Sequence, residues 1–84
     1  MFKNSVKIGN DTFYVKDGYI YKNPIFDEEG NIQSYKDIVP ISENGKYFKT
    51  IKQHYLLEDR ILVDYFNGRM DIYDLNLKLL GYLY

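Results

Sequence analysis

Residues that most often carry covalent chemistry are scarce in this sequence. His54 is the only histidine, and there is no cysteine. A lone histidine needs a positioned partner to act as a general base and further ligands to hold zinc. The serines Ser5, Ser34 and Ser42 lack the Gly-x-Ser-x-Gly setting that exposes a serine nucleophile, and the sequence has no glycine-rich phosphate loop. We therefore predict that the protein is not an enzyme and has no catalytic residues.

The acidic stretch DEEGNI has the spacing with which a calcium loop begins. Asp27, Glu29 and Asn31 stand at alternate positions, as the first ligands of such a loop do. The loop also needs a glycine where Ile32 stands and a bidentate glutamate where Ile38 stands. A hairpin turn explains the stretch better than a calcium site does.

Three further carboxylates, Asp64, Asp71 and Asp74, fall on neighbouring candidate strands. Carboxylates that approach one another can form an acid–base pair or a metal site. Strand alternation, however, places Asp71 on the same face as Arg69 and Tyr73, which predicts a solvated polar face. We expect no metal site and no cofactor.

Lysines and aromatic residues alternate in GKYFKTIK, residues 45–52. The segment contains Lys46, Tyr47, Phe48, Lys49 and Lys52. Aromatic rings can stack on bases while lysines follow the phosphate backbone, so these residues are the candidate site for an alternative function as a nucleic-acid-binding β module. The net charge of −1 argues against a nucleic-acid partner. The same alternation of lysines and aromatic residues would be found on an edge strand whose lysines discourage aggregation with another sheet.

The elements that would position these residues are short strands. Alanine is absent, ten tyrosines and five phenylalanines favour strands, and turn dipeptides such as Asp17-Gly18, Asn44-Gly45 and Asn67-Gly68 recur. The predicted strands cover residues 5–8, 12–16, 19–21, 32–35, 46–51, 61–66, 69–73 and 77–84. Their spacing predicts an all-β antiparallel meander, closed as a barrel or a sandwich. Residues 49–60 contain no turn residue and have near-helical apolar spacing, which leaves open an α+β fold with one short helix.

Two segments of the sequence resemble each other. Residues 25–35 (IFDEEGNIQSY) and 72–82 (IYDLNLKLLGY) share an isoleucine, an aromatic residue, an aspartate, an aliphatic residue, a small residue and a tyrosine in register. We expect one domain over residues 1–84, either built from two related three-strand units, at about 12–35 and 61–84, or containing two hairpins with the same turn chemistry.

The last thirteen residues, IYDLNLKLLGYLY, carry only two charged side chains. Alternation in a strand places Leu77, Leu79 and Leu83 toward the core and Leu80, Tyr82 and Tyr84 on the opposite face. A strand with two apolar faces is either central in its sheet or covered by another protein. We predict a protein-binding surface made of Leu80, Tyr82, Tyr84 and Tyr73, used by a second copy in a homodimer or by another protein.

Composition limits the compartment and the class of function. With 84 residues and 45% hydrophobic side chains the chain suits one globular domain. The absence of cysteine, of a signal-like segment and of any long apolar run predicts a cytoplasmic protein with no membrane partner. The Lys, Asn, Ile and Tyr bias is typical of AT-rich genomes. We predict a non-enzymatic module that acts by stoichiometric protein–protein interaction. The biological role we expect is that of a phage or mobile-element protein that inhibits a host defence factor, in the manner of anti-CRISPR proteins.

Overall fold

The computed structural model describes residues 4–41, 48–54, 60–65 and 68–83. These residues form ten strands and, within the described ranges, no helix, which confirms the all-β prediction. The described part of the chain accordingly contains no helix that could cross a membrane. The strands are β1 (Ser5–Ile8), β2 (Asp11–Lys16), β3 (Tyr19–Lys22), β4 (Ile25–Phe26), β5 (Ile32–Ser34), β6 (Asp37–Pro40), β7 (Phe48–His54), β8 (Arg60–Tyr65), β9 (Met70–Tyr73) and β10 (Leu79–Leu83).

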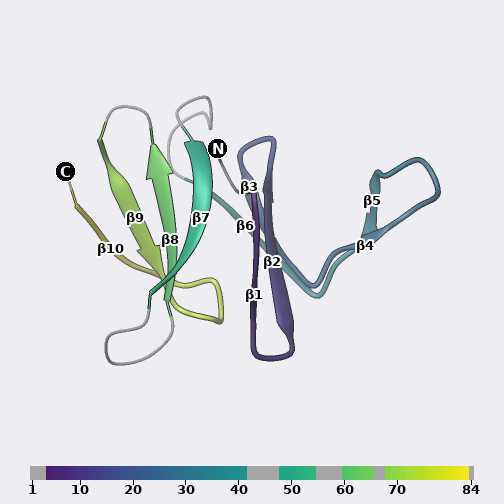
Figure 1. Cartoon of the computed structure of the whole chain (residues 1–84), viewed down its shortest axis with the longest axis horizontal. Helices are drawn as coiled ribbons and strands as arrows, with labels where there is room; N and C mark the ends of the chain where they lie inside the picture. The colour runs from purple at the N-terminus through teal and green to yellow at the C-terminus, as the bar shows by residue number, and fades with distance from the viewer. Residues whose placement is uncertain (1–3, 42–47, 55–59, 66–67, 84) are drawn as a thin grey trace.

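The strands form two four-stranded sheets and a two-stranded arm (Figure 1). The first sheet has the order β1-β2-β3-β6 and the second has the order β10-β9-β8-β7, with every pairing antiparallel. Strands β4 and β5 pair with each other and project from the first sheet, at the opposite end of the molecule from β10. The arrangement is sandwich-like, as the short turn spacing predicts.

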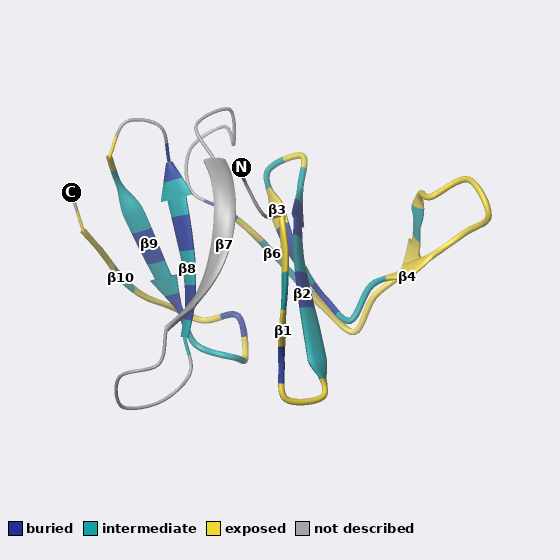
Figure 2. Cartoon of the chain, viewed as in Figure 1, coloured by how far each residue is buried: buried dark blue, intermediate teal, exposed yellow. Residues whose placement is uncertain are grey.

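One hydrophobic core lies between the two sheets. Buried side chains come from both sheets, and Figure 2 shows them as dark segments along β2, β8 and β9. In β2 the buried Phe13 and Val15 alternate with the half-buried Tyr14, so one face of the strand packs and the other faces outward. The core consists of Ile8, Phe13, Val15, Ile20, Ile41, Ile61, Val63, Tyr65, Tyr73 and Leu77.

A lysine links the two halves of the sandwich. Lys22, at the end of β3, is only 9% exposed, and its Nζ donates a hydrogen bond of 2.9 Å to the carbonyl oxygen of Leu75 in the turn after β9. The ammonium group also lies 5.8 Å from the centre of the Phe13 ring. A buried charge of this kind is tolerated because the carbonyl and the ring face replace water.

The sequence-based strand assignment differs from the structure in three places. Strands β4 and β6 were not predicted: β4 has two residues, and β6 contains Asp37 and Pro40, which are unusual in strands. Pro40 is tolerated because β6 is the outer strand of its sheet. The alternative helix over 49–60 is wrong where the structure describes it, since Phe48–His54 form β7 and Arg60 begins β8. Residues 55–59 lie outside the described part.

Two turns with the same hydrogen bonds account for the resemblance between 25–35 and 72–82. In each turn an aspartate Oδ1 accepts 2.9 Å hydrogen bonds from the amides two and four positions later, at Glu29 and Asn31 for Asp27 and at Asn76 and Lys78 for Asp74. The residue three positions after the aspartate has positive φ, 85° at Gly30 and 63° at Leu77. Asp27 therefore organises a hairpin turn, which is the interpretation that the sequence favours. The division into two three-strand units stays a prediction.

Although the two turns have the same hydrogen bonds, we expect substitution of their aspartates to change the stability of the protein by different amounts. Asp74→Ala removes the acceptor for two backbone amides beside the buried Leu77, and we expect it to lower the free energy of unfolding by about 1 kcal/mol. Asp27→Ala should lower it by less than about 0.5 kcal/mol, because the residues around this turn are exposed and add nothing to the core. Urea unfolding followed by far-UV circular dichroism measures both, and Asp74→Asn, which keeps an acceptor oxygen, is the control. Equal losses for the two alanine variants would contradict the prediction.

Candidate functional site

Five aromatic side chains lie in two neighbouring groups on the outside of the first sheet and its arm. We name this surface the tyrosine face; it consists of Tyr14, Tyr19, Tyr21, Phe26 and Tyr35. The ring centres of Tyr21 and Tyr35 are 5.4 Å apart, those of Tyr14 and Phe26 are 5.4 Å apart, and those of Tyr19 and Tyr21 are 6.3 Å apart. The first two pairs pack edge to face and the third is tilted, and these contacts hold the rings in place without burying them.

Strand register brings these rings together. Tyr14 in β2 is the cross-strand partner of Tyr21 in β3, so the two side chains share the outer face of the sheet. The arm then returns Phe26 to Tyr14 and Tyr35 to Tyr21. The three rings at the margins remain open to solvent, with Tyr19 at 42%, Phe26 at 45% and Tyr35 at 47% exposed. The result is a preorganised, half-exposed aromatic surface.

The environment of Tyr21, in the middle of this surface, favours the neutral phenol. Partial burial raises the pKa of Tyr21 above its usual 10.0, and the negative charge of Asp17 and the phenols of Tyr35 and Tyr19 raise it further. A neutral phenol with a fixed ring presents an apolar body and a polar tip to whatever binds. Such a surface suits recognition more than catalysis.

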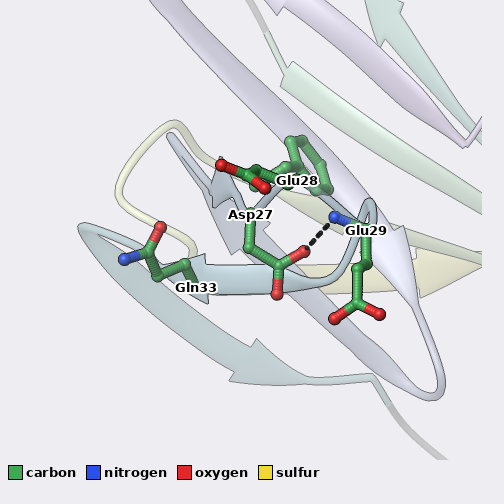
Figure 3. Close-up of a pocket in the computed structure, with 5 residues that line it drawn as sticks. Asp27, Glu28, Glu29 and Gln33 are labelled. Atoms are coloured by element: carbon green, nitrogen blue, oxygen red, sulfur yellow. Dashed lines mark hydrogen bonds between the residues drawn. The ribbon is translucent and has the colours of Figure 1, made fainter.

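A hollow of about 500 Å³ lies beside the tyrosine face, on the arm (Figure 3). Phe26, Asp27, Glu28, Glu29 and Gln33 line it. One Asp27 oxygen is held by backbone amides of its own turn, and the hollow is open to solvent. In the described residues no group of three or more histidine, cysteine, aspartate or glutamate side chains is placed to hold a metal ion. The hollow therefore adds negative charge to one end of the tyrosine face.

A buried carboxylate organises the opposite end of the molecule. Asp71 in β9 is fully buried, and its oxygens accept a 2.7 Å hydrogen bond from the Tyr65 hydroxyl and a 2.8 Å bond from Nε of Arg69. The Arg69 guanidinium, 15% exposed, lies 4.2 Å from the centre of the Tyr82 ring in β10. This chain of contacts connects the core to the outer strand β10.

The structure corrects the sequence-based placement of Asp71 and Tyr73. The sequence predicts that both lie on a solvated face, whereas they are 0% and 1% exposed. Asp71 pairs with Val63, and Tyr73 pairs with Ile61, so all four side chains share the inner face of the second sheet. Tyr73 is consequently a core residue and not part of a binding surface. Asp71 is drawn inside because Tyr65 and Arg69 satisfy its oxygens there.

Strand β10 is the outer strand of the second sheet, so the alternative of a central strand is wrong. A β-bulge between Leu79 and Gly81 shifts its register. Leu79 therefore pairs with Tyr73 and Tyr82 pairs with Asp71, which puts Leu79 and Tyr82 on one face and contradicts the strict alternation assumed from the sequence.

The expected burial of the C-terminal leucines holds for Leu77 alone. Leu77 is 5% exposed and lies in the turn before β10, whereas Leu79 and Leu83 are exposed. The predicted surface residues Leu80 and Tyr82 are exposed, and Tyr84 lies outside the described residues. The structure therefore leaves Leu80 and Tyr82 of the predicted protein-binding set on the surface.

The residues of the nucleic-acid alternative are only partly placed. Phe48, Lys49 and Lys52 lie on β7, the other outer strand of the second sheet, and their side chains are outside the description. Lys46 and Tyr47 also lie outside the described residues. Strand β7 belongs to the second sheet, whereas the tyrosine face lies on the first sheet and its arm.

Comparison of the chain with protein-family models, with curated proteins and with solved structures gives no match. The site is therefore defined by its geometry. Sequence reasoning missed the tyrosine face, although one signal was present. Tyr14 and the pair Tyr19 and Tyr21 flank the Asp17-Gly18 hairpin turn, whose positive φ angles of 52° and 87° set the register that aligns Tyr14 with Tyr21.

Proposed function

We propose that the protein is a small, non-enzymatic binding module that acts by stoichiometric contact with another protein through the tyrosine face. The observation that supports this proposal is the clustering of the aromatic rings: Tyr14 contacts Phe26, Tyr21 contacts both Tyr19 and Tyr35, and strand register places the two groups side by side on the outer face of one sheet. Tyrosine is enriched at protein interfaces because it contributes a large contact area at a small cost in conformational entropy. Edge-to-face contacts within the face reduce that cost further.

Charge favours a protein partner over nucleic acid at this surface. Asp17 lies close enough to Tyr21 to raise its pKa, and Glu28 and Glu29 stand on the arm beside Phe26. Lys16 is the cross-strand partner of Tyr19 on the same face, so the charge around the rings is mixed and is not the concentrated positive charge that binds phosphate backbones. A partner that contributes apolar area together with arginine or lysine side chains would complement both the rings and the carboxylates. Inhibition of a host defence factor, in the manner of anti-CRISPR proteins, is the biological role we propose for such a module.

The tyrosine face can be tested by comparing substitutions of its exposed tyrosines with the substitution of an exposed tyrosine at the opposite end of the molecule. Tyr35→Ala together with Tyr19→Ala should weaken capture of the partner by about 30-fold or more, the loss expected of residues central to an interface. Tyr82→Ala, whose tyrosine is exposed to a similar degree, is the matched control and should leave capture unchanged. Binding is measured by immobilising the chain, identifying the retained protein by mass spectrometry and repeating the measurement with that protein purified.

Three outcomes would contradict the proposal. Capture that survives the double substitution, or that is lost in Tyr82→Ala, would move the partner site away from the tyrosine face. Tight binding of labelled single-stranded DNA or RNA that weakens steeply as salt rises would favour the alternative function at Lys46, Lys49 and Lys52. Circular dichroism of each variant verifies that the fold is retained.

A further inference from the structure

The outer strands of the two four-stranded sheets differ in how well they are protected against pairing. Soluble proteins place charged residues or proline on such strands because an open row of backbone donors and acceptors is a template for another strand. β1 contains Lys7, β6 contains Asp37 and Pro40, and β7 contains Lys49 and Lys52. β10 has the sequence LLGYL, with no charge and no proline.

Among the described side chains of the second sheet, those of β10 form the most exposed apolar group. Leu79, Leu80, Tyr82 and Leu83 are between 44% and 58% exposed. Among the described strands β10 pairs with β9 alone, so its other edge faces outward. An apolar strand with an outward edge can be extended by another β-strand, whose backbone groups pair with those of the open edge.

The hydrogen bonds of the hairpin that joins β8 and β9 determine which edge of each strand the backbone N–H and C=O groups face. The Tyr65 amide donates to the Arg69 carbonyl oxygen at 2.9 Å, which identifies this as a hydrogen-bonded pair. Antiparallel pairs alternate, so Asp71 exchanges hydrogen bonds with Val63, and its neighbours Met70 and Ile72 direct their backbone groups toward β10.

The same alternation determines which backbone groups of β10 face β9 and which face the outer edge of the sheet. Ile72 pairs with Gly81 and Met70 pairs with Leu83, so the backbone groups of Gly81 and Leu83 face β9. Those of Tyr82, between them, point toward the outer edge of the sheet. A strand that approaches this edge would meet the N–H and C=O of Tyr82 at the centre of the regular stretch that follows the bulge.

We propose that β10 pairs with β10 of a second copy of this chain, antiparallel and about a two-fold axis at Tyr82. In this register the two Tyr82 residues exchange backbone hydrogen bonds, and Gly81 of each copy lies opposite Leu83 of the other. The two second sheets then form one continuous eight-stranded sheet. Cross-strand tyrosine pairing adds aromatic contact at the centre.

A second copy fits this strand because the pairing is self-complementary in charge and in shape. No charged side chain of β10 meets another across the axis, whereas the same pairing of β1 or β7 would bring lysines together. Gly81 leaves room for Leu83 of the other copy, since a Cβ at this position would meet nothing within 4 Å. Each Arg69 beside the axis is already neutralised by Asp71.

The pairing would leave the tyrosine face accessible. β10 and the arm lie at opposite ends of the longest axis of the molecule (Figure 1). A dimer through β10 therefore carries two tyrosine faces, one at each end, and can bind two partner molecules, each with the affinity of a single face. The dimer does not depend on the proposed function of that face.

The test is the mass of the purified chain in solution as concentration rises. Sedimentation equilibrium from about 1 µM to 1 mM, a range that covers weak strand-paired dimers, should show the mass rising from 10.1 kDa toward twice that value. Tyr82→Lys places two positive charges opposite each other, and Tyr82→Glu places two negative charges there. Each variant alone should dimerise at least about tenfold more weakly than the unsubstituted chain.

Mixing the two variants tests the register. A mixture of Tyr82→Lys and Tyr82→Glu sets opposite charges across the axis and should restore the dimer, which requires that position 82 faces itself. Tyr35→Lys, a charge introduced at an exposed tyrosine of the other sheet, is the matched control and should dimerise like the unsubstituted chain. A monomer at every concentration, an unaffected Tyr82→Lys dimer, or a mixture that fails to associate would each overturn the proposal. No partner protein is needed, so this result is independent of the capture experiment.

Discussion

Asp71→Ala is expected to lower the free energy of unfolding by about 3 kcal/mol, the loss typical of removing one member of a buried ion pair. The substitution leaves the Tyr65 hydroxyl without its 2.7 Å acceptor and the mostly buried Arg69 guanidinium without its 2.8 Å carboxylate partner. An 84-residue domain has a small total stability, so this loss is a large fraction of it. Urea unfolding followed by far-UV circular dichroism measures the change.

Two controls separate the buried pair from a general effect of removing charge. Asp37→Ala removes an exposed carboxylate that accepts a hydrogen bond only from the next amide, at Ile38, and should change stability by less than about 0.5 kcal/mol. Asp71→Asn keeps an acceptor for the Tyr65 hydroxyl but removes the charge opposite Arg69, so its effect should be intermediate. An Asp71→Ala protein as stable as Asp37→Ala would show that the cluster does not stabilise the fold.

Stability should also fall at alkaline pH because of Tyr73. Burial of this side chain, followed by the negative charge of Asp71, raises its pKa from 10.0 to about 12, while Arg69 acts in the opposite direction. The folded state therefore holds the phenolic proton more tightly than the unfolded state does. The stabilisation is fully present below pH 10 and is lost as the pH rises through 12. A pKa difference of about 2 corresponds to roughly 3 kcal/mol.

The matched variant for this pH effect is Tyr73→Phe, which keeps the ring and removes the ionisable group. Urea unfolding at intervals between pH 8 and pH 12 should show a shallower loss of stability for Tyr73→Phe than for the unsubstituted chain. The difference between the two curves isolates Tyr73 from lysines and other tyrosines that titrate in the same range. Parallel curves would mean that the pKa of Tyr73 is the same in the folded and unfolded states.

Local sequence was sufficient to predict the turns and most of the strands. The positive φ that Asp17 and Gly18 adopt is tolerated by these residue types, so the hairpin can be read from the dipeptide itself. The same holds for the likeness of 25–35 to 72–82, since the Asp27 and Asp74 turns depend on bonds within five consecutive residues. Aromatic and β-branched residues between such turns favour strands irrespective of what covers them.

Which face of each strand is covered depends on contacts that no short segment contains. Asp71 is buried because Tyr65 and Arg69 reach it from the neighbouring strand and turn, and a charged residue has no apolar signal that would reveal this in the sequence. The bulge at Leu79 and Gly81 reverses the faces of β10, and a shift of one residue is invisible to a pattern of period two.

The candidate site itself required the tertiary fold. Tyr14, Tyr21, Phe26 and Tyr35 come together because β3 pairs with both β2 and β6 and because the two ends of the arm between β3 and β6 bring Phe26 to Tyr14 and Tyr35 to Tyr21. The exposure of β10 likewise follows from its place at the end of the strand order. The aromatic content of the sequence does not by itself show which rings lie in the core and which lie on the surface. Their positions followed from strand order and register, because long-range pairing determines which side chains meet and which stay exposed.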